Sequence, residues 1–235
     1  PGNTGDSGEA QSNANGTTEA PKTAGEHIAQ LRCEGHYYSN FFDSSKEVVI
    51  YLHQNRKDLK ERTQRFHRAF YDSSLPEEIL DQINSHLNTF RTSSWLTKDG
   101  DFGIIEGLSP DRSFAGLATT DVAMYGGVAT AMLFPEMDRR VTLAHARLQQ
   151  ESGIVLHSIP KNFAAGNERE GSGKRIDMPQ QFAYMALRAY YWCGDWNFLE
   201  SIWPHVKLAL DYILRERDAN QDSLPDMEGI MCSYD

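Results

Sequence analysis

Apolar residues recur at three- and four-residue steps, or multiples of them, over a long stretch near the start of the chain. Ser44 and Glu47 have the spacing of a capping box, in which each side chain caps a backbone N–H at a helix start. The apolar positions that follow are Val48, Val49, Leu52, Leu59, Phe66 and Phe70. This pattern predicts a long amphipathic helix over about 44–71.

A second helix is predicted directly after the first. Ser74 and Glu77 repeat the capping-box spacing, and Pro76 suits the first turn of a helix. The apolar positions of this segment are Ile79, Leu80, Ile83, Leu87 and Phe90. They form one stripe, so the helix is expected to bury one face.

The periodicity then changes to that of a β-hairpin. Residues 94–97 and 102–105 are two short apolar stretches, and Asp99-Gly100 between them supplies the positive φ of a tight turn. Helical spacing returns afterwards over 120–133, 135–151, 178–193 and 196–217. With one hairpin and no alternation of strands and helices, the fold class is mostly α.

The chain divides into three parts by composition. Residues 1–34 form a disordered or linker segment, because 1–22 contain no aromatic residue and no Val, Ile, Leu or Met. Residues 35–43 are rich in aromatics and resemble the end of a preceding domain. The helical domain is expected over 44–235.

Composition narrows the classes of partner. The formal net charge is −10, with a pI near 5.3, and a mean hydropathy of −0.56. A negative surface repels phosphate backbones, so nucleic acid is not an expected partner. No transmembrane segment is expected, because no apolar run approaches the length needed to span a bilayer. The sequence assigns no compartment, with the cytoplasm favoured over secretion.

Glu106 is the first candidate for chemistry. It follows the apolar stretch Phe102 to Ile105 and precedes Gly107, where the hairpin ends and a Gly- and Ser-bearing loop begins. A carboxylate at that position projects from a rigid support. The alternative interpretation is a solvated turn residue.

Three stretches together resemble a known enzyme family. They are LPEEILDQINSHLNTFRTSSWLTKDGDFGIIEG, then TTDVAMYGG with LFPEMDRR, then the stretch from DMPQQFAYMALRAYYWCGDWNFLE to MCSYD. In this order they resemble the catalytic domain of glycoside hydrolase family 116, the non-lysosomal glucosylceramidases and related β-glucosidases and β-xylosidases. The resemblance runs from about Gly35 to Asp235.

The resemblance implies an (α/α)6 barrel, of which this chain would form the N-terminal part, and a retaining β-glycosidase mechanism. It assigns the nucleophile to Glu106 and the acid/base to Asp235, at the end of Ser233-Tyr234-Asp235. Asp121 matches a family carboxylate, which we expect to tune the acid/base or to hold the sugar; the alternative is a helix cap. Two carboxyl groups in different environments are what glycoside hydrolysis needs.

The chain also departs from the family pattern. Where the glucosylceramidases carry Pro-His-Asp, this chain has Pro160-Lys161-Asn162. His157 is a candidate to compensate for the missing imidazole; the alternative is a structural histidine. The implied substrate is a β-glucoside or a β-xyloside, glycolipids included, and specificity for glucose is not assigned.

Two other functions stay open. Twelve helices of ordinary length need more residues than this chain has, so we expect a fragment that lacks the remainder of its catalytic domain and is inactive alone. One alternative is therefore a non-catalytic helical module that binds carbohydrate or protein. The other is a helical glycosidase that inverts configuration.

A metal site is a further hypothesis. Asp218, Asn220 and Asp222 alternate like the opening of a calcium loop. Ser223 and Gly229 occupy positions where an EF-hand needs Gly and Glu, which excludes an EF-hand. The catalytic reaction needs no cofactor, and a structural calcium ion is the alternative to a polar loop between helices.

Overall fold

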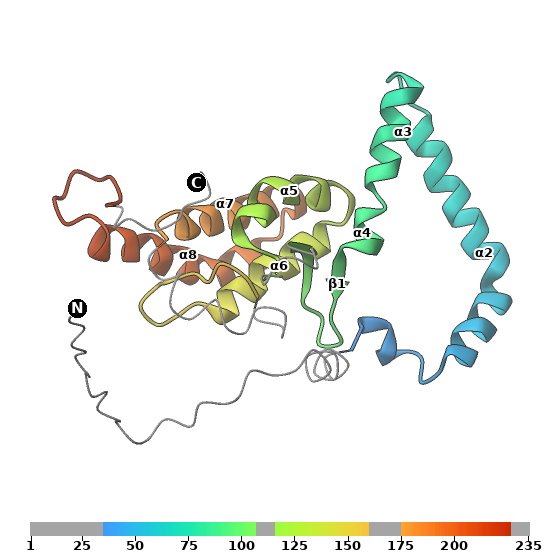
Figure 1. Ribbon diagram of the computed structural model, residues 1–235, viewed down its shortest axis with the longest axis horizontal. Coiled ribbons are helices and arrows are strands. Elements are labelled where there is room, and N and C mark those ends of the chain that lie inside the picture. The colour runs from blue at the N-terminus through green and yellow to red at the C-terminus, as the bar shows by residue number, and fades with distance from the viewer. Residues whose placement is uncertain (1–34, 107–115, 160–174, 227–235) are drawn as a thin grey trace, which may run out of the picture.

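The computed structural model describes residues 35–106, 116–159 and 175–226. These residues are mostly helical, as predicted, with a small three-stranded antiparallel sheet (Figure 1). The helices are η1 (Tyr37–Asn40), α2 (Ser45–Tyr71), α3 (Glu77–His86), α4 (Thr89–Thr92), α5 (Thr120–Leu133), α6 (Pro135–Leu148), α7 (Met178–Cys193) and α8 (Trp196–Glu216).

The predicted hairpin is confirmed. Strand β1 (Ser94–Leu96) pairs antiparallel with β2 (Phe102–Glu106), and Gly100 in the turn has a φ of +96°. A third strand, β3 (Gly116–Leu117), pairs with the end of β2. The sequence analysis missed β3 because two residues carry no periodicity.

Helices α5 to α8 form the packed body of the molecule. Helix α7 contributes most to one core cluster, which also takes residues from α6 and α8. Its fully buried members include Met178, Phe182, Ile202 and Val155. A second cluster joins the sheet to α6 and α7, and includes Trp95, Leu117 and Met185. The two clusters hold the sheet and the helices as one unit.

A buried ion pair connects three of these helices. Arg188 of α7 donates through Nη2 to Asp138 Oδ1 of α6 at 2.5 Å, with both side chains at least 96% buried. The same guanidinium donates to the carbonyl oxygens of Ala123 and Met124 in α5. A Cβ at Gly127 would meet this guanidinium, so only glycine leaves room for it.

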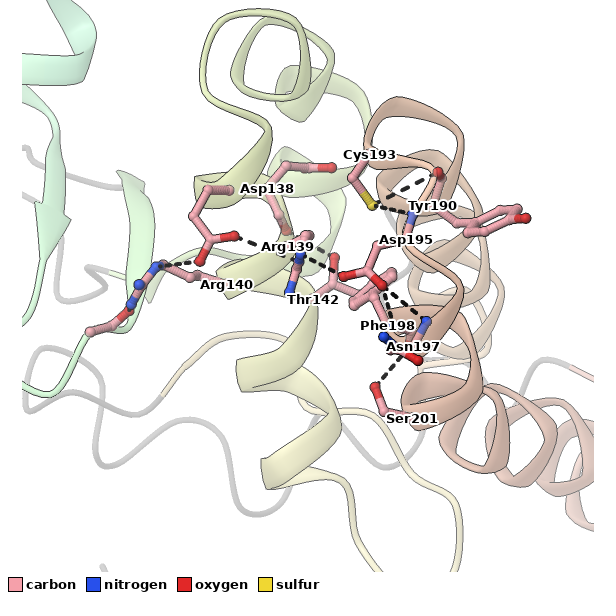
Figure 2. A network of polar contacts seen from close by, with 12 residues as sticks. Asp138, Arg139, Arg140, Thr142, Tyr190, Cys193, Asp195, Asn197, Phe198 and Ser201 are labelled. Carbon is pink, nitrogen blue, oxygen red and sulfur yellow. Dashed lines mark hydrogen bonds and ion pairs between the residues drawn. The ribbon is translucent and has the colours of Figure 1, made fainter.

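The start of α8 is fixed by a capping aspartate (Figure 2). Asp195 Oδ1 accepts from the backbone N–H groups of Asn197 and Phe198, at 2.9 and 3.2 Å. Its other oxygen accepts from Arg139 of α6 at 3.0 Å. The side chain therefore satisfies unpaired donors of one helix while it binds a second helix.

Helices α2 and α3 form an arm that stands away from the body (Figure 1). The capping box at its start is confirmed in part: Ser44 Oγ accepts from the N–H of Glu47. The Glu47 carboxylate bonds back to the N–H of Asp43, one residue before the predicted partner. Among the described residues, α2 has none that is buried, and α3 buries only Leu80.

The aromatic segment before α2 packs on the tip of the hairpin. Trp95 Nε1 donates to the carbonyl oxygen of Gly35 at 3.0 Å, and Asn40 Nδ2 donates to that of Lys98 at 2.8 Å. His36 forms a β-bridge with Thr97. This segment therefore contacts the described domain itself, whatever precedes it.

Two details of the sequence prediction are wrong. Pro76, not Ser74, is the N-cap of α3, and no side chain caps that end. The helix also stops at His86, so Phe90 falls in the separate turn α4. No helix in the described part of the chain has both the length and the apolar character needed to cross a membrane.

Candidate functional site

Strand β3 brings together three segments that are distant in sequence. On one side Glu106, the last residue of β2, pairs with Gly116. On the other side Leu117 forms a bridge with Ile159, whose N–H donates to the Leu117 carbonyl at 2.8 Å. Two short pairings thus place the end of the hairpin beside the segment that carries His157.

The start of α5 is tied to the same place. The backbone N–H of Thr120 donates to the carbonyl oxygen of His157 at 2.6 Å, and its hydroxyl donates to that oxygen at 2.9 Å. Ala118, just before the helix, has a φ of +51°, and its carbonyl accepts from the buried ring of His145 at 2.9 Å. These contacts fix the backbone on both sides of Asp121.

The result is a cluster of three side chains that could ligate or react. Glu106, Asp121 and His157 each offer an atom within 4.8 Å of the others. His157 Nε2 lies 3.3 Å from Asp121 Oδ1, and both side chains are 15% exposed. Glu106 Oε2 is buried and has no hydrogen-bond partner among the described residues.

Asp121 is held ionised by its neighbours. Burial by itself would raise the pKa of this carboxyl group. The hydrogen bond from His157, the charge of that ring, the N–H of Val122 and the charge of Arg175 act in the other direction and lower the pKa to about 2. Since the carboxylate accepts, His157 Nε2 carries the proton in this contact.

Arg175 is a further member of the site. Its side chain is 10% exposed and lies between two carboxylates, 3.8 Å from Asp121 and 3.7 Å from Asp177. Its buried Nε has no hydrogen-bond partner in the described residues. The site thus holds a cation beside two or three anions.

Tyr125 lies at the edge of the cluster, one helical turn after Asp121 on α5. The ring is 63% exposed. Burial and the charges of Asp121 and Glu106 raise the pKa of its hydroxyl group. The i, i+4 spacing from Asp121 is a signal in the sequence that would have identified this residue.

Two predicted catalytic positions fall outside the described residues. Asp235, the expected acid/base, and Ser233 both lie in 227–235. The structure does bring together Glu106, Asp121 and His157, which are up to 51 residues apart in sequence. Arg175 and Tyr125 were missed by sequence analysis.

The predicted calcium ligands lie elsewhere, in the loop after α8. The two oxygens of Asp218 accept from the N–H groups of Asp222 and Ser223, and Asp222 accepts from the N–H of Leu224. Asn220 also hydrogen-bonds Asp222. This is the behaviour of a polar turn. Among the described residues, the His, Cys, Asp and Glu side chains grouped closely enough for an ion are those of the Glu106 cluster.

Comparisons with known proteins assign no family. The sequence matches no protein-family model, and a search of curated proteins finds no significant match. The function must therefore be argued from the cluster itself.

Proposed function

We propose that this chain carries part of the active site of a retaining β-glycoside hydrolase, with Glu106 as the nucleophile. The observation that supports this most is the cluster of Glu106, Asp121 and His157 on three separate segments. A nucleophilic carboxylate needs a free oxygen and a rigid support. Glu106 Oε2 has no hydrogen-bond partner among the described residues, and the carboxylate stands at the end of a paired strand.

In the proposed reaction, Glu106 attacks the anomeric carbon while the bond to the leaving oxygen breaks. A carboxylic acid gives its proton to that oxygen, and a water molecule later releases the sugar from Glu106. Asp121 cannot be this acid near neutral pH, because a pKa of about 2 leaves it ionised. The acid must be another group, and the family resemblance assigns it to Asp235.

Asp121 and its two partners are then given an electrostatic role. The carboxylate oxygens of Asp121 and Glu106 lie within 4.8 Å. Two negative groups at that separation favour the positive charge that develops on the sugar ring in the transition state. His157 and Arg175 hold Asp121 in place and limit the repulsion between the two carboxylates.

Hydrolysis of aryl β-glucosides and β-xylosides by the full-length protein tests this proposal. We expect Glu106→Gln to lower kcat by at least about a thousandfold, because the nucleophile is lost. The matched control is Glu136→Gln, an exposed acid on α6, which should retain wild-type rates. Equal rates for wild type and Glu106→Gln would contradict the proposal and favour a module that only binds.

A divalent cation is the second candidate, because one imidazole and two carboxylates suit such an ion. The positive charge of Arg175, 3.8 Å from Asp121, disfavours it. The measurement is binding of Zn²⁺ or Mn²⁺ by calorimetry, with His157→Ala as the comparison. Binding lost in that variant, together with activity abolished by a chelator, would favour the metal over the glycosidase.

A further inference from the structure

Helix α2 presents an apolar stripe that no described part of the chain covers. Leu52, Leu59 and Phe66 are seven residues apart, which places them on one face of the helix. Leu52 is 50% exposed and Phe66 51%. An uncovered stripe of this length is typical of a surface that binds another helix.

Helix α8 presents a second stripe with the same spacing. Trp196, Trp203 and Leu210 are seven residues apart, and Leu214 follows four residues later. Their side chains are 65%, 56%, 37% and 59% exposed. The opposite face of α8 packs into the core of the body. Helix α8 is therefore apolar on two faces, of which the described residues cover one.

The two stripes are complementary in charge. Helix α2 has seven Lys or Arg and three Asp or Glu, a formal charge of +4 in a chain of −10. The rest of the chain is consequently at −14. Arg56 and Arg62 flank the stripe of α2, whereas the exposed acids Glu200 and Asp211 flank that of α8. Opposite charges beside an apolar seam select a partner helix.

The stripes cannot meet within one chain as it is folded here. Helix α2 and the exposed length of α8 lie toward opposite ends of the long axis of the molecule (Figure 1). Two copies related by a twofold axis perpendicular to that long axis place each α2 beside α8 of the other copy. At 1.5 Å per residue the helices span about 40 and 30 Å, so the stripes match in length.

We propose that two copies of this chain form a symmetric dimer in which the α2 stripe of each copy packs along the α8 stripe of the other. One contact type, used twice, covers both uncovered stripes and closes the assembly. It also pairs the basic arm with the acidic body.

Molar mass by light scattering tests the dimer. Wild-type protein is expected at twice the chain mass of 26.6 kDa. Leu52→Glu and Trp203→Glu should each return it to one chain mass, because both stripes are required. Leu75→Glu, at an exposed leucine outside both stripes, should stay dimeric. Circular dichroism checks that each variant keeps its helices.

A cysteine crosslink tests the register. In a background with Cys33, Cys193 and Cys232 replaced by Ser, protein with Leu59→Cys is mixed with protein with Trp203→Cys and oxidised. We expect a disulfide-linked pair containing one chain of each kind. Wild-type protein with one chain mass, or a dimer that survives both Glu variants, would overturn the proposal. Monomers that sediment with phosphatidylserine vesicles through α2 would instead assign the stripe to a lipid surface.

Discussion

Asp121 shows how three neighbours set the state of one carboxyl group. Burial opposes its charge, yet His157, Val122 and Arg175 together lower its pKa to about 2. Sequence analysis identified Asp121, Glu106 and His157 because each follows a recognisable element or motif. Arg175 could not be found, because it follows no periodic segment and acts through charge across the fold. Its two carboxylate partners are known only from the structure.

The lowered pKa predicts a defined loss of stability in acid. Because the folded pKa lies below that of the unfolded chain, the ionised carboxylate stabilises the fold above about pH 4. That contribution, on the order of 2 kcal/mol, is lost as the pH falls toward 2. Asp121→Asn should flatten this part of the profile when urea unfolding is measured between pH 2 and pH 5. Asp58→Asn, on the exposed face of α2, should leave it unchanged.

A profile for Asp121→Asn that matches wild type across that range would contradict the assigned contacts. The result would mean that Asp121 titrates at the same pH in the folded and unfolded chain.

At the scale of elements, local signals predicted most boundaries. Helix α2 begins after its capping serine, and the hairpin turns at the expected glycine. The signals failed where tertiary contacts decide the structure. Strand β3 exists only because it pairs with β2 and with Ile159. Likewise, nothing local indicated that Arg188 of α7 pairs with Asp138 of α6.

The Arg188–Asp138 pair predicts a test of helix packing. Arg188→Met leaves a buried carboxylate without its partner and should lower the free energy of unfolding by about 3–5 kcal/mol. Burial already raises the pKa of Asp138, with Arg188 acting in the opposite direction. The double variant Arg188→Met with Asp138→Leu should recover much of the loss, as measured by urea unfolding. A double variant as unstable as the sum of both single changes would contradict this account.

At the scale of the whole molecule, the described chain has a packed body and a projecting arm (Figure 1). The predicted mostly-α class is confirmed, whereas the (α/α)6 barrel stays a proposal. The charge of −10 pointed away from acidic partners. The structure shows that this net value hides a basic helix on an acidic body, which a sum over the chain cannot reveal.

This division predicts where backbone amides are most protected. Helix α7 contributes to both core clusters, whereas α3 buries one side chain. Hydrogen exchange followed by mass spectrometry should therefore find α7 exchanging by global unfolding and α3 exchanging much faster by local opening. Similar protection of α3 and α7 would mean that the arm is part of the body.

The central claim, that Glu106 is the nucleophile of a retaining glycosidase, is tested most directly by trapping its covalent intermediate. The full-length protein is incubated with an activated 2-fluoro β-glucoside or β-xyloside, digested, and mapped by mass spectrometry. The account predicts a single glycosyl group on the peptide that contains Glu106. A label on any other residue would contradict it, as would turnover with inversion and no labelled peptide.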